Sequence, residues 1–143
     1  SARDETQPLR IILIRDARHL DLNAKLFQSS EPVWILTSHQ PTFALPEFVK
    51  AFEAPDWSPA AVVKLLSDQG IQSLLVEGGS HVQAAFVAAG LVDKLVAYIT
   101  PLMIGGTGLS AVTGLGNAHM LRFTSPTIQR LGDDIKLTAR RDD

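Results

Sequence analysis

The chain has 143 residues, enough for one domain with a sizeable core, and its 45% hydrophobic and 20% charged residues are ordinary for a soluble globular protein. A formal net charge of −2, without any long basic run, argues against nucleic acid as a partner. There is no cysteine, which excludes disulfides and thiolate chemistry. No apolar stretch reaches membrane-spanning length, so we expect a cytoplasmic protein without a membrane partner.

The first third of the chain contains two short runs of apolar and β-branched residues. LRIILI at 9–14 and VWILT at 33–37 predict strands that are buried on both faces. The polar segment 21–32 predicts a loop with one helical turn, and the weaker run at 48–52 predicts a short edge strand.

A helix with clearly marked ends follows. Ser58 can cap it, Pro59 suits the first helical position, and Gly70 can close it. The apolar run 71–76 then predicts another buried strand.

The second half of the chain continues the alternation of strands and helices. A glycine pair opens an alanine-rich helix that Gly90 closes, and 95–100 predicts a strand. After the glycine-rich loop 106–119, two alternating runs around Gly-Asp-Asp predict a C-terminal β-hairpin. The fold class expected is α/β, with a mixed, largely parallel sheet and flanking helices.

The glycine turn in LLVEGGSHVQAAF (74–86) is the most informative local feature. A helix N-terminus offers unpaired N–H groups and a positive dipole end, and glycine lets a phosphate approach the backbone. Taken alone, a glycine pair between a strand and a helix is more often a tight turn without a ligand, and the pattern by itself favours that interpretation.

The wider context carries a family resemblance. The stretch VEGGSHVQAAFVAAGLVDKLVAYITPLMIGGTG, followed by the hairpin with RLGDDIKL, resembles the C-terminal reductase domain of the bifunctional riboflavin-biosynthesis deaminase-reductases. PLRIILIRDARHLDLNAKLF and VWILTS resemble the same family. The resemblance implies a dihydrofolate-reductase-like fold, a homodimer, and natural fusion to a deaminase domain.

The same resemblance implies an activity and a set of site residues. The activity is NADPH-dependent reduction of 5-amino-6-(5-phosphoribosylamino)uracil, or of its diaminopyrimidinedione analogue, to the ribitylamino product. No catalytic side chain is assigned, because hydride transfer needs placement and exclusion of water more than a strong acid or base. The resemblance places Glu77 and Arg3 at the substrate, and Arg15, Thr37, Gly79, Ser80, His81, Val82, Gln83 and Ala84 at NADPH.

Each assignment has a plainer alternative. Glu77 could pair with a neighbouring donor at a strand end, and Ser80 could be an ordinary helix cap. Thr37 could make only a local hydrogen bond. Arg15 stands where the family commonly has a serine near the adenosine 2′-phosphate; its guanidinium suits that phosphate, but it could equally be a surface arginine paired with Asp16 or Asp133.

Some features of the family are absent from this sequence. Neither its Ser-Leu-Asp-Gly type motif nor its Asp-Asp-Pro motif is found. We therefore expect 1–143 to be a single reductase-like domain without the family's first strands, and poorly active alone. The alternatives are another dihydrofolate-reductase-like oxidoreductase, or a non-catalytic nucleotide-binding module. The four histidines share no metal-ligand spacing, so no metal site is expected.

Overall fold

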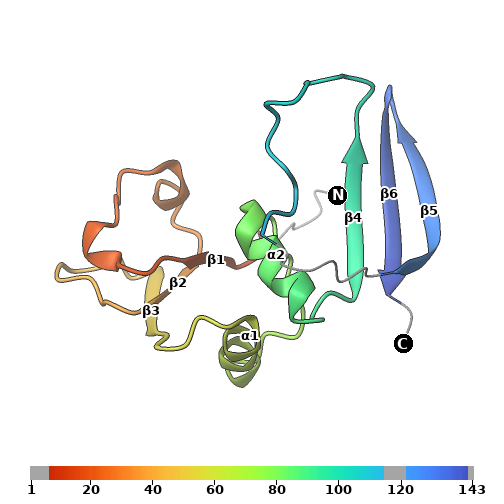
Figure 1. The fold of residues 1–143 in the computed structure, drawn as a ribbon. Coiled ribbons are helices and arrows are strands. Elements are labelled where there is room, and N and C mark those ends of the chain that lie inside the picture. Colours follow the sequence, from red (N-terminus) through yellow and green to blue (C-terminus); the bar gives the residue numbers. More distant parts are fainter. Residues whose placement is uncertain (1–6, 115–121, 142–143) are drawn as a thin grey trace, which may run out of the picture. The chain divides into compact units, whose positions relative to one another are not determined.

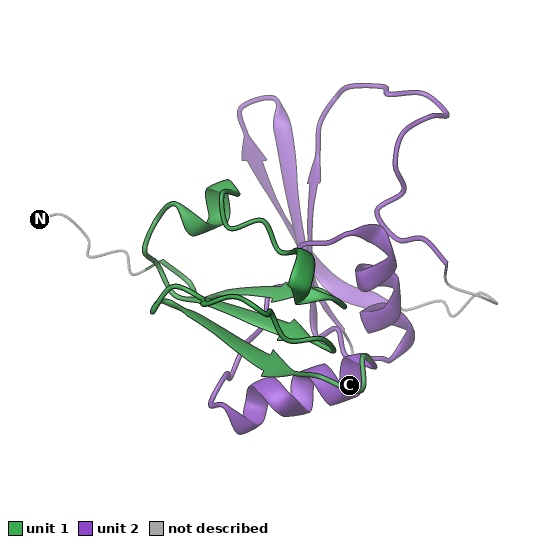
Figure 2. Ribbon diagram, turned by 90° about the vertical axis from the view of Figure 1, so that its left-hand side faces the viewer, with its two compact units in different colours: residues 1–57 green, residues 58–143 purple. Residues whose placement is uncertain are grey.

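The structure is a computed structural model that describes residues 7–114 and 122–141. The chain divides into two compact units, Ser1–Trp57 and Ser58–Asp143, shown in different colours in Figure 2. That the whole chain forms one reductase-like domain stays a prediction.

The first unit is built on a parallel sheet. Its strands are β1 (Arg10–Leu13), β2 (Val33–Thr37) and β3 (Val49–Glu53), in the order β1-β2-β3 (Figure 1). All three strands were predicted from their apolar runs, and each end of each strand agrees with the prediction to within one residue. Because β2 lies in the middle, it hydrogen-bonds to a neighbouring strand on each side. Its first four residues place apolar side chains on both faces of the sheet.

Two short 3-10 helices complete the core of this unit. They are η1 (Ala17–His19) and η2 (Lys25–Phe27), and η2 is the helical turn predicted within 21–32. One side chain from each packs into the core cluster, together with residues of β2 and β3. The buried members of this cluster are Ala17, Phe27, Val33, Ile35 and Val49.

The helices of the second unit begin and end where the sequence predicts. In α1 (Pro59–Asp68), the Ser58 side chain accepts a hydrogen bond from Ala61 N at 3.3 Å, and Gly70 closes the helix with φ +87°. Helix α2 (Ser80–Ala88) is followed by Gly90 with φ +67°. Both glycines adopt the left-handed conformation that side chains disfavour. Among the described residues, no helix is both long and apolar enough to cross a membrane.

An antiparallel sheet forms the rest of the second unit. Its strands are β4 (Lys94–Ile99), β5 (Phe123–Leu131) and β6 (Asp134–Arg141), in the order β4-β6-β5 (Figure 1). A tight turn joins β5 to β6, with Leu131 opposite Asp134, so the predicted C-terminal hairpin is confirmed. A parallel sheet, an antiparallel sheet and two α-helices make the chain mixed α/β, as expected.

One predicted strand is wrong. Residues 71–76 form no strand, and Leu74 and Leu75 are 39% and 74% exposed. A strand exists only where a neighbouring strand pairs with its N–H and C=O groups, and within the described residues no strand pairs with this run. An apolar run predicts a buried strand, but it does not show whether a neighbouring strand is available to pair with it.

The central position of β2 leads to a stability prediction. Ile35→Ala should lower the free energy of unfolding by about 2–5 kcal/mol, because Ile35 is fully buried and its removal leaves a cavity. Ile128→Ala is the matched control, since Ile128 also lies in a strand but is 68% exposed, and it should cost less than about 1 kcal/mol. Urea denaturation of both variants checks this, and equal losses would contradict the assignment of the core.

Candidate functional site

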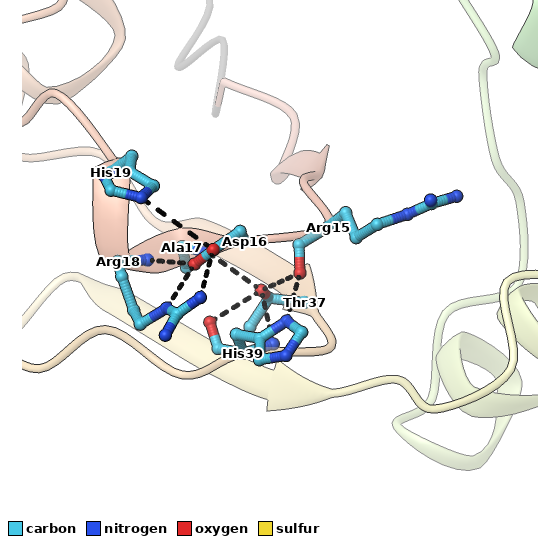
Figure 3. A network of polar contacts seen from close by, with 7 residues as sticks. All are labelled: Arg15, Asp16, Ala17, Arg18, His19, Thr37 and His39. Atoms are coloured by element: carbon cyan, nitrogen blue, oxygen red, sulfur yellow. Dashed lines mark hydrogen bonds and ion pairs between the residues drawn. The ribbon is translucent and has the colours of Figure 1, made fainter.

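The carboxyl ends of β1 and β2 carry a cluster of charged and polar side chains (Figure 3). The two segments remain paired beyond the strands, since Ser38 N donates to Arg15 O at 3.1 Å and Ala17 N donates to His39 O at 3.0 Å. Ligands of parallel α/β sheets commonly bind outside the carboxyl ends of strands. This end of the sheet is therefore a candidate binding surface.

Asp16 and Arg18 form a closed pair in this cluster. The Asp16 carboxylate accepts hydrogen bonds from Arg18 N at 3.0 Å, from Arg18 Nε at 2.9 Å and from Arg18 Nη2 at 2.6 Å. The side-chain hydrogen bond from Arg18 holds the pKa of Asp16 well below its usual range, and the same bond raises the pKa of Arg18. Asp16 thereby caps η1 and takes up the charge of Arg18. Sequence reasoning missed this pair, although an aspartate just before a helical turn is a readable cap signal.

Arg15 is the unpaired cation of the cluster. It is exposed, and within the described residues its guanidinium makes no hydrogen bond or ion pair. Figure 3 shows its side chain extending away from the network. The alternative of an ion pair with Asp16 is not what the structure shows, because Arg18 occupies that carboxylate. A free guanidinium at a strand end is well suited to a phosphate.

Thr37 lies beneath this surface rather than on it. The residue is 0% exposed, and its hydroxyl is hydrogen-bonded to backbone atoms of Arg15, Ala17 and His39. The local hydrogen bonds that the sequence left as an alternative are therefore present.

The second candidate site is the start of α2 in the other unit. Gly79 is the N-cap residue and has no side chain to bond the first turn. Its carbonyl already accepts Val82 N at 3.0 Å and Gln83 N at 3.1 Å. Within the described part of the chain, the N–H groups of Gly79, Ser80 and His81 have no backbone acceptor. These are the N–H groups at which the glycine turn predicts an anion, and the binding of an anion there stays a prediction.

The two glycines before α2 differ in backbone conformation. Gly78 has φ +144°, which side chains rarely adopt, and the Gly78–Gly79 peptide bond is cis. Gly79 has φ −67° and ψ −178°, and a Cβ placed on it would meet no atom within 4 Å. Among the described residues, the space next to the Gly79 Cα on the side of a Cβ is therefore open.

The remaining predicted residues differ in what they offer a ligand. Ser80 is the first residue of α2 and not its cap, so the plainer alternative for it does not hold. His81 is exposed, Val82 and Gln83 are half-buried, and Ala84 is 4% exposed and belongs to the core.

The predicted substrate residues can be described only in part. Glu77 is exposed and, among the residues described, pairs with no donor, so its carboxylate is available to a ligand. Arg3 lies outside the described residues. In the ranges 7–114 and 122–141, no three His, Cys, Asp or Glu side chains are grouped to hold a metal ion.

Comparison with known proteins matches this chain to one protein family. Residues 1–137 match the RibD C-terminal domain family. The riboflavin biosynthesis protein RibD of Bacillus amyloliquefaciens is 35% identical over 146 residues, which cover 93% of this chain and 39% of that protein. The 2,5-diamino-6-ribosylamino-4(3H)-pyrimidinone 5′-phosphate reductase of Archaeoglobus fulgidus is 25% identical, over 95% of this chain and 64% of that protein.

A solved structure shows the same fold. Acinetobacter baumannii RibD aligns with a TM-score of 0.77 and 26% identity, over 96% of this chain and 38% of that one. The chain belongs to the RibD C-terminal domain family, with its dihydrofolate-reductase-like fold. It spans about two fifths of the length of the RibD proteins compared here.

The two glycines of the turn should respond differently to alanine. Gly78→Ala should lower the free energy of unfolding by about 1–3 kcal/mol, because a side chain at φ +144° is strained. Gly79→Ala should cost less than about 1 kcal/mol, since its backbone conformation is allowed and its surroundings are open. Thermal and urea unfolding of the two variants measure the difference. A larger loss for Gly79→Ala would contradict this geometry.

Proposed function

We propose that this chain is the reductase part of a riboflavin-biosynthesis enzyme. It would reduce the ribosylamino group of 5-amino-6-(5-phosphoribosylamino)uracil, or of the diaminopyrimidinedione analogue, to a ribitylamino group. The match to the RibD C-terminal domain family over 1–137 carries this proposal, and the pyrimidinone phosphate reductase of Archaeoglobus fulgidus supports the substrate class. NADPH, when bound, would supply a hydride to the imine-like carbon of the opened ribose.

The start of α2 fits the pyrophosphate of such a cofactor. The free N–H groups of Gly79, Ser80 and His81 can donate to phosphate oxygens, and the positive end of the helix dipole favours their charge. His81, Val82 and Gln83 have side chains at least partly exposed beside this turn. Ala84 contributes by packing, since it is buried.

Glu77 fits a role at the substrate. It lies directly before the glycine turn, is exposed, and meets no donor within the described part of the chain. A carboxylate in this state can accept hydrogen bonds from the ring N–H or hydroxyl groups of a phosphoribosylaminopyrimidine. Because hydride transfer depends on placement of the reactants, holding the pyrimidine is the main task of such a residue. Arg3, predicted for the substrate phosphate, remains a proposal from sequence.

The assembly of the whole protein is also a proposal. We infer a cytoplasmic homodimer from the family resemblance. We also infer natural fusion to a deaminase domain, because the RibD relative is much longer than the segment it shares with this chain.

Turnover separates this function from its alternatives. NADPH oxidation should be followed by absorbance, with the phosphoribosylaminouracil and with other carbonyl and imine substrates. Oxidation only with the phosphoribosylaminopyrimidine supports the proposal. Preference for an unrelated substrate indicates another oxidoreductase, and tight NADPH binding without turnover in the longest natural form of the protein indicates a nucleotide-binding module.

Arg15 gives a prediction on cofactor choice. NADPH should bind more tightly than NADH, because the free guanidinium can pair with the 2′-phosphate. Arg15→Ala should weaken NADPH binding by about 1–3 kcal/mol and leave NADH binding nearly unchanged. Isothermal titration with both cofactors measures this. Lys25→Ala is the control, since Lys25 is another exposed cation of the same unit, and an equal or larger effect there would remove Arg15 from the site.

Gly79 gives a second prediction, in which NADPH binding is weakened while the thermal stability of the chain is kept. Gly79→Asp should weaken NADPH binding roughly tenfold or more, because a carboxylate would take the free N–H groups and repel the phosphate. The same carboxylate should cap α2, so the melting temperature should not fall. Gly79→Asn is the matched control of equal size and no charge. Added salt should restore part of the loss for the aspartate variant but little for the asparagine variant.

Contrary results would have clear meanings. If both variants melt like the parent chain and bind NADPH normally, the glycine pair is only a turn. If both lose stability in proportion to binding, the substitutions act on folding.

A further inference from the structure

Thr37 is the only buried polar side chain among the residues described. It ends β2, directly after the fully buried Ile35 and Leu36, and is itself 0% exposed. A hydroxyl removed from water is tolerated when its hydrogen bonds are replaced within the protein. The partners of this hydroxyl therefore show why a polar residue stands at this position.

The hydrogen-bonding capacity of the Thr37 hydroxyl is fully used. It accepts hydrogen bonds from Ala17 N and from His39 N, each at 3.2 Å. Its proton faces two carbonyls, Arg15 O at 3.2 Å and His39 O at 3.0 Å. A hydroxyl has one proton and two lone pairs, so nothing remains for a ligand. Together with its complete burial, this rules out direct contact between the Thr37 side chain and a cofactor.

The bonds of Thr37 join the two segments that leave the parallel sheet. Arg15 O also accepts Ser38 N at 3.1 Å, and the His39 ring nitrogen Nδ1 lies 3.4 Å from the same carbonyl (Figure 3). The carbonyl of Arg15 is therefore contacted by three successive residues of the neighbouring segment, while its guanidinium is exposed and unpaired within the described residues. A fixed backbone reduces the conformational freedom that the side chain loses when it binds an anion.

We propose that Thr37 is a positioning residue, whose buried hydroxyl fixes the backbone of Arg15 and thereby orients the Arg15 guanidinium for the 2′-phosphate of NADPH. This inference rests on the proposed cofactor site. It moves Thr37 from the set of residues that touch the cofactor to one that acts through Arg15. The consequence is that Thr37 controls the preference for NADPH over NADH, and not nucleotide binding in general.

The test is a double-mutant cycle between Thr37 and Arg15. Thr37→Val removes the hydroxyl and nearly preserves the shape, and it should weaken NADPH binding about 2- to 12-fold while NADH binding is unchanged. In the Arg15→Ala background, Thr37→Val should have no further effect on NADPH. Dissociation constants for both cofactors are measured by titration calorimetry or fluorescence on all four proteins.

A milder pair of variants covers the case in which the valine variant does not fold. Thr37→Ser keeps the hydroxyl, whereas Thr37→Cys replaces its oxygen with a weakly hydrogen-bonding sulfur of similar placement. The serine variant should keep the ratio of NADPH to NADH affinity near that of the parent chain. The cysteine variant should lower this ratio toward that of Thr37→Val.

The outcomes distinguish this inference from the function beneath it. A parent chain that binds both cofactors equally overturns the assignment of Arg15 and, with it, the role of Thr37. If the parent prefers NADPH and Arg15→Ala abolishes the preference, but Thr37→Val and Thr37→Cys leave it intact, only the positioning role is overturned. Equal weakening of both cofactors, or an effect that persists without the arginine, likewise overturns it.

Discussion

The backbone pairing of β2 on both sides is the constraint on which the first unit depends. Its residues are removed from water, so every N–H and C=O group must find a partner in β1 or β3. This requirement fixes the register along the strand and continues past its end, where Thr37 O accepts Ala54 N at 2.8 Å. The positions at which the chain leaves the sheet are consequently fixed as well. The backbone at this end of the sheet, where Arg15 lies, is therefore fixed by its hydrogen bonds to the core strand β2.

The same requirement explains what is missing in the second unit. The run 71–76 has the composition of a buried strand, and β4 has apolar residues such as Leu95, Tyr98 and Ile99, all of them partly or largely exposed. Within the described residues, β4 pairs only with β6, and 71–76 pairs with no strand. Backbone groups that lack a protein partner must be solvated. The apolar side chains beside them then remain exposed, whatever their intrinsic preference.

Features set by neighbours in sequence were predictable, and features set by distant partners were not. Ser58, Pro59 and Gly70 mark the ends of α1 because capping and left-handed closure involve only a few adjacent residues. The open N–H groups before α2 follow from the glycine turn in the same way. Burial of Thr37 depends instead on partners about twenty residues away in the chain, as the bond to Arg15 O shows. No local pattern distinguishes such a threonine from one on a surface.

The two candidate cofactor contacts differ in which part of the residue would bind. At the start of α2 the backbone itself offers the donors, so a substitution there matters mainly through the bulk or charge it adds. At Arg15 the carbonyl already accepts hydrogen bonds from the neighbouring strand end, and the guanidinium is unpaired among the described residues. Another side chain could replace that of Arg15 without altering any bond that its carbonyl accepts. The charge presented at this strand end can therefore change by single substitution, while the hydrogen bonds that hold the strand ends remain as they are.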